Sequence, residues 1–176
     1  TAYEPDPTHS NIARGMLSAN GLEQSVEWIQ AAVVSKVPAT GTVEFVRVNG
    51  NSTSSHVAGA KENPYGELSH FRVPCRSFGQ IVETCDLIKM DVEGLEAELV
   101  SSLSPVNRQT LPGMILEVGS QRNAQTIFDQ AKVLNLNLFS QKKDWNRVTD
   151  FDDMPTSYKH GSLFLTTKSR MPWPAA

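Results

Sequence analysis

The sequence predicts an α/β fold with a largely parallel sheet, and three observations lead to it. β-rich runs alternate with segments of helical periodicity along most of the chain, as they do in βαβ units. One strand, 86–91, reads as a buried run that ends at an acidic pair, after which Gly94 turns the chain into a helix. The last two strands, 136–140 and 162–167, follow one another without a helix, which predicts an antiparallel edge pair.

The N-terminal part is expected to start with the tail of a strand at 1–3. Asp6 followed by Pro7 is a typical helix start, with a capping side chain and then proline at the first helical position. Asn20-Gly21 is a typical helix end. The apolar stripe of this helix consists of Ile12, Ala13, Met16 and Leu17.

Two strands, 26–34 and 42–48, are expected next, with a turn at 38–41 between them. The segment 49–67 is polar, lacks periodicity and is predicted to be a long loop. A strand at 70–75 and a short helix at 77–83 complete this part of the chain.

The C-terminal part is predicted to contain two amphipathic helices. The buried face of the first, 94–103, is expected to consist of Leu95, Leu99, Val100 and Leu103. The buried face of the second is expected to consist of Ala124, Ile127, Phe128, Ala131 and Leu134. The remaining segments are a linker at 105–112, a strand at 114–118, a mostly irregular stretch at 142–159 and a Pro-rich end at 171–176.

Composition excludes several classes of protein. A length of 176 residues suffices for one domain, expected at 1–168, with a tail at 169–176. The net charge of −3 argues against a nucleic-acid partner, and no run is long and apolar enough for a membrane span. Cys75 and Cys85 form neither a metal motif nor a disulfide framework, so no metal site is predicted and a reducing, cytoplasmic location is expected.

Asp91 and Glu93 are the first candidate site residues, because ligands bind beyond the carboxyl ends of strands in open α/β sheets. The alternative is that both carboxylates only cap the following helix. Lys89 is unusual inside a strand that should be covered on both faces. Either it pairs with Asp91, Glu93 or Glu117, or its side chain extends to the sheet edge.

Five segments in order resemble one known family, the FkbM family of S-adenosylmethionine-dependent methyltransferases, from Ala2 to about Lys168. The segments are Ala2-Tyr3-Glu4-Pro5-Asp6-Pro7, Asn20-Gly21-Leu22, Gly41-Thr42-Val43-Glu44-Phe45, Ile88-Lys89-Met90-Asp91-Val92-Glu93-Gly94-Leu95-Glu96 and, more weakly, Leu116-Glu117-Val118. The resemblance implies a Rossmann-like methyltransferase sheet, mostly parallel with an antiparallel last strand.

The resemblance also implies a cofactor, S-adenosylmethionine, and residues that bind it. Glu4 takes the place of the carboxylate that binds the ribose hydroxyls, although on its own it reads as an ordinary exposed acid. Ala32, with its neighbour Ala31, would flank the adenine, although alanine also simply packs. Asp91 would lie beside the methyl donor and acceptor.

The implied activity is methyl transfer to a hydroxyl of a small molecule or sugar. Asp91 or Glu93 would take the hydroxyl proton, with Lys89 beside them. The loop 49–67 would lie over the acceptor, where His56 is a candidate second base, although a lone loop histidine is usually solvated. Glu117 is the other candidate for contact with the acceptor.

The chain departs from the family at one motif. Family members carry a first strand and a Gly-rich turn ahead of the Glu-Pro segment, whereas this sequence contains no Gly-x-Gly run. We therefore expect the first strand to be lacking and the chain alone to bind S-adenosylmethionine weakly or not at all. The neighbouring strands would close up, be completed by a second copy in a homodimer, or be completed by a missing N-terminal segment.

Two other functions remain open on the sequence. One is a non-catalytic fragment or descendant of this fold that has lost cofactor binding. The other is a nicotinamide-binding oxidoreductase, because an acid after the second strand also binds ribose in that class.

Overall fold

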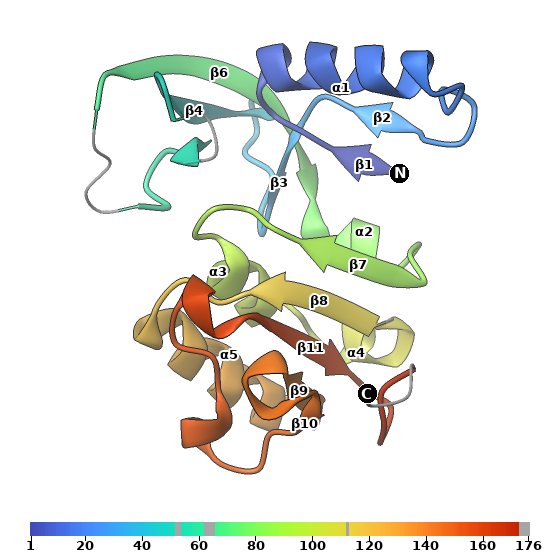
Figure 1. Cartoon of the computed structure of the whole chain (residues 1–176), viewed down its shortest axis with the longest axis vertical. Helices are drawn as coiled ribbons and strands as arrows, with labels where there is room; N and C mark the ends of the chain where they lie inside the picture. Colours follow the sequence, from blue (N-terminus) through green and yellow to red (C-terminus); the bar gives the residue numbers. More distant parts are fainter. Residues whose placement is uncertain (52–53, 62–65, 112, 173–176) are drawn as a thin grey trace. The chain divides into compact units, whose positions relative to one another are not determined.

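The computed structural model describes residues 1–51, 54–61, 66–111 and 113–172 (Figure 1). The chain forms two compact units, Thr1–Phe78 and Gly79–Ala176. Both combine helices with strands, and the sheets mix parallel and antiparallel pairs, so the predicted α/β class is confirmed. The division into one domain at 1–168 and a tail stays a prediction.

The first layer of unit 1 is a short parallel pair crossed by one helix. Strand β1 (Ala2–Tyr3) pairs with β2 (Trp28–Ile29), and helix α1 (Pro7–Ala19) connects them. The predicted helix start is confirmed: Asp6 Oδ1 accepts hydrogen bonds from the amides of Thr8 (2.8 Å) and His9 (3.3 Å), and proline occupies the first turn.

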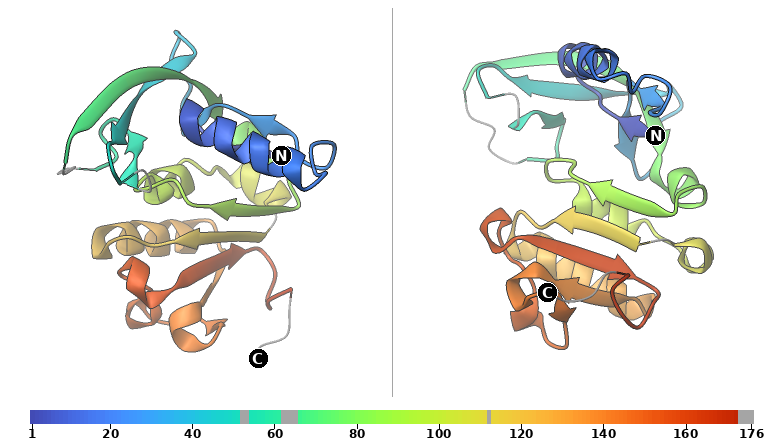
Figure 2. Two further views of the ribbon diagram at one scale, coloured as in Figure 1. Left: turned by 45° about the horizontal axis from the view of Figure 1, so that its top comes forward. Right: turned by 45° about the vertical axis from the view of Figure 1, so that its right-hand side comes forward.

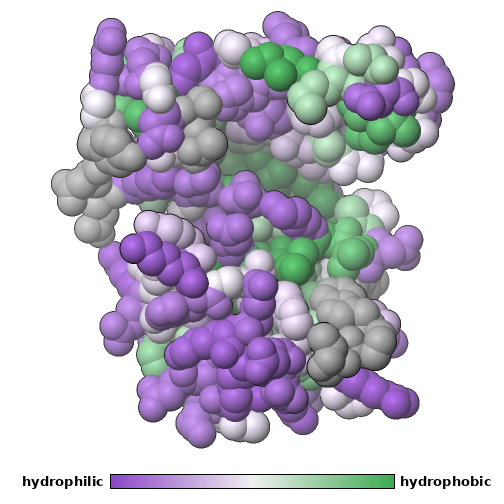
Figure 3. All heavy atoms as spheres, in the orientation of Figure 1, coloured by the Kyte–Doolittle hydropathy of each residue, from purple (hydrophilic) through white to green (hydrophobic). Residues whose placement is uncertain are grey.

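The predicted apolar stripe of α1 is only partly covered. Ile12 and Met16 are 57% and 63% exposed, whereas the buried residue is Ser10, whose hydroxyl oxygen accepts a hydrogen bond from Trp28 Nε1 (2.6 Å). Two-residue strands offer too little surface to bury a whole helix face. Figure 3 accordingly shows apolar atoms at the surface in the region of α1.

The second sheet of unit 1 has the order β3-β6-β4-β5. Its strands are β3 (Ala32–Val34), β4 (Thr42–Val48), β5 (His56–Val57) and β6 (Leu68–Ser77). Strand β6 runs parallel to β3 and antiparallel to β4. The predicted single strand 26–34 is therefore wrong, because the chain leaves one sheet after Ile29 and enters the other at Ala32.

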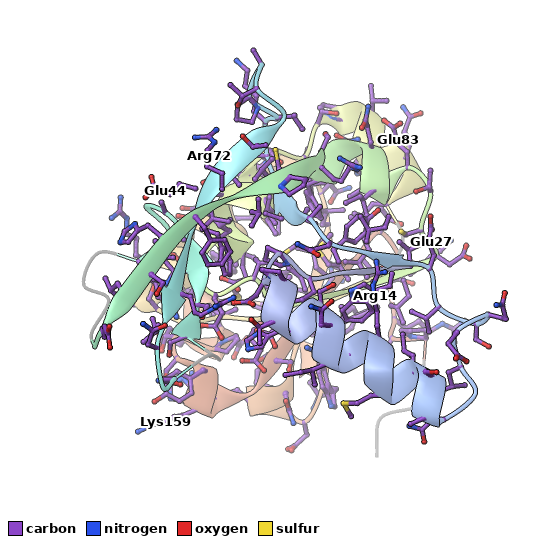
Figure 4. The ribbon with its side chains drawn as sticks, turned by 90° about the horizontal axis from the view of Figure 1, so that it is seen from above. Arg14, Glu27, Glu44, Arg72, Glu83 and Lys159 are labelled. Carbon is purple, nitrogen blue, oxygen red and sulfur yellow. The ribbon has the colours of Figure 1, made fainter. Side chains whose placement is uncertain are left out.

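The apolar side of this sheet forms a small core. Its buried members are Ala32, Val34, Phe45, Val73 and Cys75. Phe45 packs against Phe71 with ring centroids 5.6 Å apart. Glu44 and Arg72 are partners in the β4–β6 register, and both are exposed on this ribbon (Figure 4).

The predicted loop 49–67 contains an ordered part. Strand β5 lies within it and pairs antiparallel with β4, so the expectation of a structureless loop is wrong there. Residues 52–53 and 62–65 of this segment lie outside the described residues. The predicted turn at 38–41 is confirmed, since the Gly41 amide, at φ 68°, donates to the Pro38 carbonyl (2.9 Å).

Unit 2 contains a five-stranded sheet of order β10-β9-β11-β8-β7 (Figures 1 and 2). The strands are β7 (Leu87–Met90), β8 (Gly113–Glu117), β9 (Asn137–Ser140), β10 (Asn146–Arg147) and β11 (Ser162–Thr166). Strands β7 and β8 are parallel, and β11 is antiparallel to both β8 and β9. The antiparallel pair is confirmed, but β11 lies inside the sheet and not at its edge.

The helices of the C-terminal part are α2 (Phe78–Val82), α3 (Glu96–Ser101), α4 (Pro105–Thr110) and α5 (Gln121–Val133). Helix α4 corrects the predicted linker 105–112, whose residue 112 lies outside the described residues. Ser104 and Asn107 form a reciprocal capping box, which stabilises the start of this short helix.

The predicted faces of α3 and α5 are confirmed, and the two helices pack against one another. The buried residues are Leu95, Leu99, Val100, Leu103, Ala124, Ile127, Phe128, Ala131 and Leu134. None of the helices in the described part of the chain has the length and apolar character needed to cross a membrane.

The stretch predicted to be irregular, 142–159, contains only short elements besides β10. These are the 3-10 turns η2 (Gln141–Lys143), η3 (Phe151–Asp153) and η4 (Tyr158–His160). On the face seen in Figure 3 the atoms in this region are hydrophilic. Residues 173–176 of the predicted Pro-rich end lie outside the described residues.

Candidate functional site

Strand β7 leads directly into the acidic loop, defined here as residues 91–95. Lys89 and Asp91 stand two residues apart, and their Nζ and Oδ2 atoms are 3.2 Å apart. Of the alternatives proposed for Lys89, the structure shows the ion pair with Asp91. Both side chains are exposed, 70% for Lys89 and 46% for Asp91, so this pair contributes at most about 1 kcal/mol to stability.

The expectation that β7 is buried is wrong. Leu87 is 57% exposed, and within the strand only Met90 is buried. Strand β7 is the terminal strand in the order of its sheet, and among the described residues it pairs on one side only, with β8. An edge strand can carry a lysine at little cost, which removes the conflict that made Lys89 notable in the sequence.

The acidic loop has an uncommon backbone. Glu93 has φ 51°, in the left-handed region that non-glycine residues rarely enter, and Gly94 follows with φ 111°. Such a conformation costs a glutamate about 1–2 kcal/mol, so surrounding contacts must hold it.

Glu96 supplies those contacts. Its carboxylate accepts a hydrogen bond from the amide of Val92 (3.1 Å), and both of its oxygens lie within reach of the amide of Gly94 (3.1 and 3.4 Å). The residue is only 4% exposed. Helix α3 begins after Leu95, which offers no capping side chain, so the helix start is organised by Glu96 reaching back into the loop.

The environment of Glu96 disfavours its charge. Burial raises the pKa of this carboxyl above its usual value, and the nearby charge of Asp91 raises it further. The hydrogen bonds from the amides of Glu96 itself, Val92 and Gly94 act in the opposite direction. Burial prevails, so Glu96 holds a proton more readily than an ordinary surface glutamate.

Glu117 ends β8, the neighbour of β7. The register pairs Met90 with Leu116, so Asp91 and Glu117 follow adjacent positions at the carboxyl ends of two parallel strands. Glu117 is exposed. Unit 2 thus places Asp91 and Glu117 at adjacent strand ends, with Glu93 in the loop after β7 and Lys89 within that strand.

In unit 1, Glu4 stands at the carboxyl end of β1. Its Oε1 accepts a hydrogen bond from the Asp6 amide (2.7 Å), and its own amide donates to the Ile29 carbonyl (3.1 Å). Within the described residues the second carboxylate oxygen accepts no hydrogen bond. Burial raises the pKa of Glu4, while the Asp6 amide and the charge of His9 lower it.

A buried ion pair holds the turn that carries Glu4. The Asp6 carboxylate is fully buried, and Arg47 on β4 binds it through two nitrogens, Nε to Oδ2 and Nη2 to Oδ1, both at 2.6 Å. Arg47 also donates to Thr8 Oγ1 (3.0 Å) and lies over the ring of Phe71. This clamp fixes the N-terminus of α1 to the second sheet of the unit.

Two other predicted residues have roles in packing. Ala32 is 2% exposed and belongs to the core of unit 1, in keeping with the alternative that it simply packs. His56 is not a solvated loop residue: it is 2% exposed, lies on β5, and its Nδ1 is 2.9 Å from the Ser54 carbonyl. A carbonyl only accepts, so Nδ1 carries the proton of this contact.

The predicted residues divide between the units. Glu4, Ala32 and His56 belong to unit 1, and the acidic group at β7 and β8 belongs to unit 2. That they surround one cofactor stays a prediction. Among the described residues, no three His, Cys, Asp or Glu side chains come together as metal ligands.

Sequence reasoning missed Glu96 and Arg47 as functional candidates. A signal for Glu96 was present, since it shares a helical face with Leu99, Val100 and Leu103, where a carboxylate is out of place. Arg47 gave no such signal, because its partner is 41 residues away in the sequence.

Comparisons with known proteins give no match to a family model, a curated protein or a solved structure. The chemistry of the described residues therefore carries the functional argument. Exposed carboxylates at strand ends accept hydrogen bonds from hydroxyl groups and take up protons. In unit 2, Asp91 and Glu117 are exposed carboxylates at or next to strand ends, whereas Glu4 in unit 1 is half-buried.

Proposed function

We propose that this protein belongs to the S-adenosylmethionine-dependent methyltransferases and transfers a methyl group to a hydroxyl of a small molecule or sugar. The observation that carries the proposal is the group of acidic residues at the carboxyl ends of the parallel strands β7 and β8. In the same sheet β11, the last strand along the chain, is antiparallel to β8. That arrangement is the one implied by the resemblance of the Ile88–Glu96 segment to the FkbM family.

The proposed finer fold is a Rossmann-like methyltransferase sheet. The sheet of unit 2, with β7 and β8 parallel and β11 antiparallel to β8, would be part of it. Strands β1 and β7 belong to different sheets, so the expectation that they close up over a lacking strand is wrong for the described residues. Completion by a second copy or by a further N-terminal segment remains a proposal.

The fit of the cofactor to the residues is mixed. Glu4 has a carboxylate oxygen with no hydrogen bond from the described residues, at a strand end, and one such oxygen can accept from a ribose hydroxyl. Ala32, in contrast, is taken up by the core, and the sequence lacks a Gly-x-Gly turn. The cofactor would supply an electrophilic methyl group on a sulfonium; the residues of the chain would bind and orient it.

Methyl transfer needs an acceptor oxygen held in line with the methyl group, and this positioning supplies much of the rate. Asp91 or Glu93 would hold the acceptor hydroxyl and take its proton as the bond forms. Lys89, paired with Asp91, would orient that carboxylate. Glu117, at the adjacent strand end, would contact the acceptor.

Calorimetric titration with S-adenosylhomocysteine tests the proposal. We expect weak binding by this chain; a Kd near 1 μM, about −8 kcal/mol, would contradict the argument from the lacking glycine turn. A form that includes a Gly-rich first strand should bind more tightly. If neither form binds, and NAD⁺ binds in a parallel titration, the oxidoreductase alternative replaces the proposal.

Substitution of Asp91 tests the site. In an active form, Asp91→Asn should lower turnover by about 10²–10⁴-fold, the usual contribution of a general base. The same change should cost this chain at most about 1 kcal/mol, since the Lys89 pair is exposed. Activity that survives largely intact would make Asp91 a structural residue.

A second candidate is a non-catalytic relative that keeps the fold. The burial of Ala32 in the core favours it, because no side-chain surface is left there for an adenine ring. If no form binds S-adenosylhomocysteine or NAD⁺, this candidate is the one to retain.

A further inference from the structure

We infer that Glu96 is a positioning residue: its buried carboxylate ties the acidic loop into one conformation and thereby orients Asp91 and Glu93. The consequence for catalysis rests on the proposed function, whereas the tie itself is a property of unit 2. Glu96 touches neither reactant in this scheme and acts only through the loop.

The first step of the argument is that the loop needs a tie. Between β7 and α3, Glu93 lies in the left-handed region and Gly94 follows with φ 111°. An untied loop would leave that conformation, because most other backbone angles are more stable for a glutamate.

The second step is that Glu96 supplies the tie. The amides of Val92 and Gly94 flank Glu93 on both sides, and both donate to the same carboxylate. A carboxylate that receives both amides holds the peptide units on either side of Glu93 in fixed orientations. These bonds are shielded from water, since Glu96 is 4% exposed, and hydrogen bonds to a charged acceptor are stronger than neutral ones.

The third step is that capping of α3 does not by itself require this carboxylate to be buried, although its own amide in the first turn is a further donor to it. Surface glutamates stabilise the first turn of a helix without being buried, and Glu98 in the same turn is exposed. Burying Glu96 disfavours its charge, as its raised pKa shows. We conclude that the buried carboxylate has a local structural role, which is to accept hydrogen bonds from the amides of Val92 and Gly94.

The matched variants are Glu96→Gln and Glu98→Gln, which remove the same charge from the same helical turn. In Glu96→Gln, amide hydrogen exchange at Val92 and Gly94 should become about tenfold faster or more, because one strong acceptor is lost. Exchange at Leu99, whose amide bonds within the helix to Leu95, should stay unchanged. Glu98→Gln should alter neither.

Glu96→Asp is the second variant, which keeps the charge but shortens the side chain by one methylene. It should lose the same protection if reach to the loop is what matters. Unchanged exchange at Val92 and Gly94 in both variants would overturn the inference. Faster exchange that includes Leu99 would also overturn it, since it would mean that α3 itself had loosened.

Titration with S-adenosylhomocysteine separates this inference from the proposed function. In a form of the protein that binds it, Glu96→Gln should weaken binding by about tenfold and Glu98→Gln should not. Equal affinities with altered loop exchange would show that the loop orientation does not serve the cofactor. If wild-type protein does not bind at all, the proposed function fails, while the exchange experiment still decides whether Glu96 ties the loop.

Discussion

The ion pair between Asp6 and Arg47 should be a major source of stability in unit 1. The perturbation is a double-mutant cycle with Asp6→Asn and Arg47→Met. Asparagine keeps an oxygen for capping α1, so Asp6→Asn removes the charge and one of the two hydrogen bonds from Arg47. Methionine keeps much of the arginine stem that packs over Phe71 and removes the guanidinium.

The magnitude follows from burial. Removing one partner of a fully buried pair costs about 3–5 kcal/mol, mainly because the other charge is left uncompensated. Asp6 is fully buried but Arg47 is 28% exposed, so Arg47→Met should cost about 2–4 kcal/mol. Asp6→Asn should cost about 1–3 kcal/mol, since Arg47 can turn to water, and the coupling energy should be about 1.5–3 kcal/mol.

The pH dependence has a definite sign. Burial alone would raise the pKa of Asp6, but the hydrogen bonds from Arg47 and from the amides of Thr8 and His9 prevail and hold it below the usual 3.8. A carboxyl with a lowered pKa in the folded state stabilises the protein above its unfolded pKa and loses this contribution as the pH falls through its folded pKa. The gap between wild type and Asp6→Asn should therefore narrow below about pH 4.

Urea unfolding followed by tryptophan fluorescence measures these energies. Trp28 is a suitable reporter, because its Nε1 bonds to Ser10 on α1. A coupling energy under about 0.5 kcal/mol would refute the reasoning and place this pair with ordinary surface ion pairs. A gap that is independent of pH between 3 and 7 would refute the pKa argument alone.

Three further outcomes are expected in unit 2. Asp91→Asn should lower the pKa of Glu96, because burial and then the Asp91 charge raise it; ¹³C titration of the Glu96 carboxyl measures this, and a pKa unmoved or raised would contradict it. Asp153→Asn should make amide exchange in 149–153 faster at pH 7 but alter it less in strong acid. Lys143 and the loop amides hold the pKa of Asp153 well below its usual range. The stabilisation that the ionised Asp153 gives this loop is therefore lost only as the pH falls through that low value. Gly113→Ala should cost about 1–3 kcal/mol in urea unfolding, because an added Cβ would lie 2.5 Å from a buried ring carbon of β11; an unchanged midpoint would mean that the ring yields freely.

Long elements with a clear period could be predicted from the sequence. The face of α5 was predicted residue by residue, and the bounds of β4 at Thr42–Val48 agree with the structure. Capping chemistry was equally readable at Asp6, because Asp followed by Pro acts locally. These features depend on residues that are close together in the sequence, so a single sequence is enough to predict them.

Features set by distant partners could not be predicted. The exposure of β7 depends on its position as the terminal strand of its sheet. The division of the predicted strand 26–34 into β2 and β3 depends on their pairing with different strands, β2 with β1 and β3 with β6. The burial of His56 depends on pairing between β5 and β4. In each case the local pattern was ambiguous and tertiary contacts decided it.

The candidate site shows the same division. Asp91 and Glu117 were predictable at strand ends, because a parallel sheet places its carboxyl ends together whatever its other details. The backbone angle of Glu93 and the hydrogen bonds of Glu96 were not, because they depend on how one loop closes.

The segment Glu4–Asp6 links stability to the proposed site in unit 1. The Asp6 carboxylate caps α1 and binds Arg47, while the Asp6 amide donates to Glu4. A change at Arg47 therefore acts on Glu4 without touching it, by freeing the peptide unit that holds one of its oxygens. If Glu4 binds a ribose, Arg47→Met should weaken binding of S-adenosylhomocysteine even under conditions in which the variant remains folded. If Glu4 is only a turn residue, the same variant should lose stability and leave binding unchanged, so one substitution distinguishes the two roles.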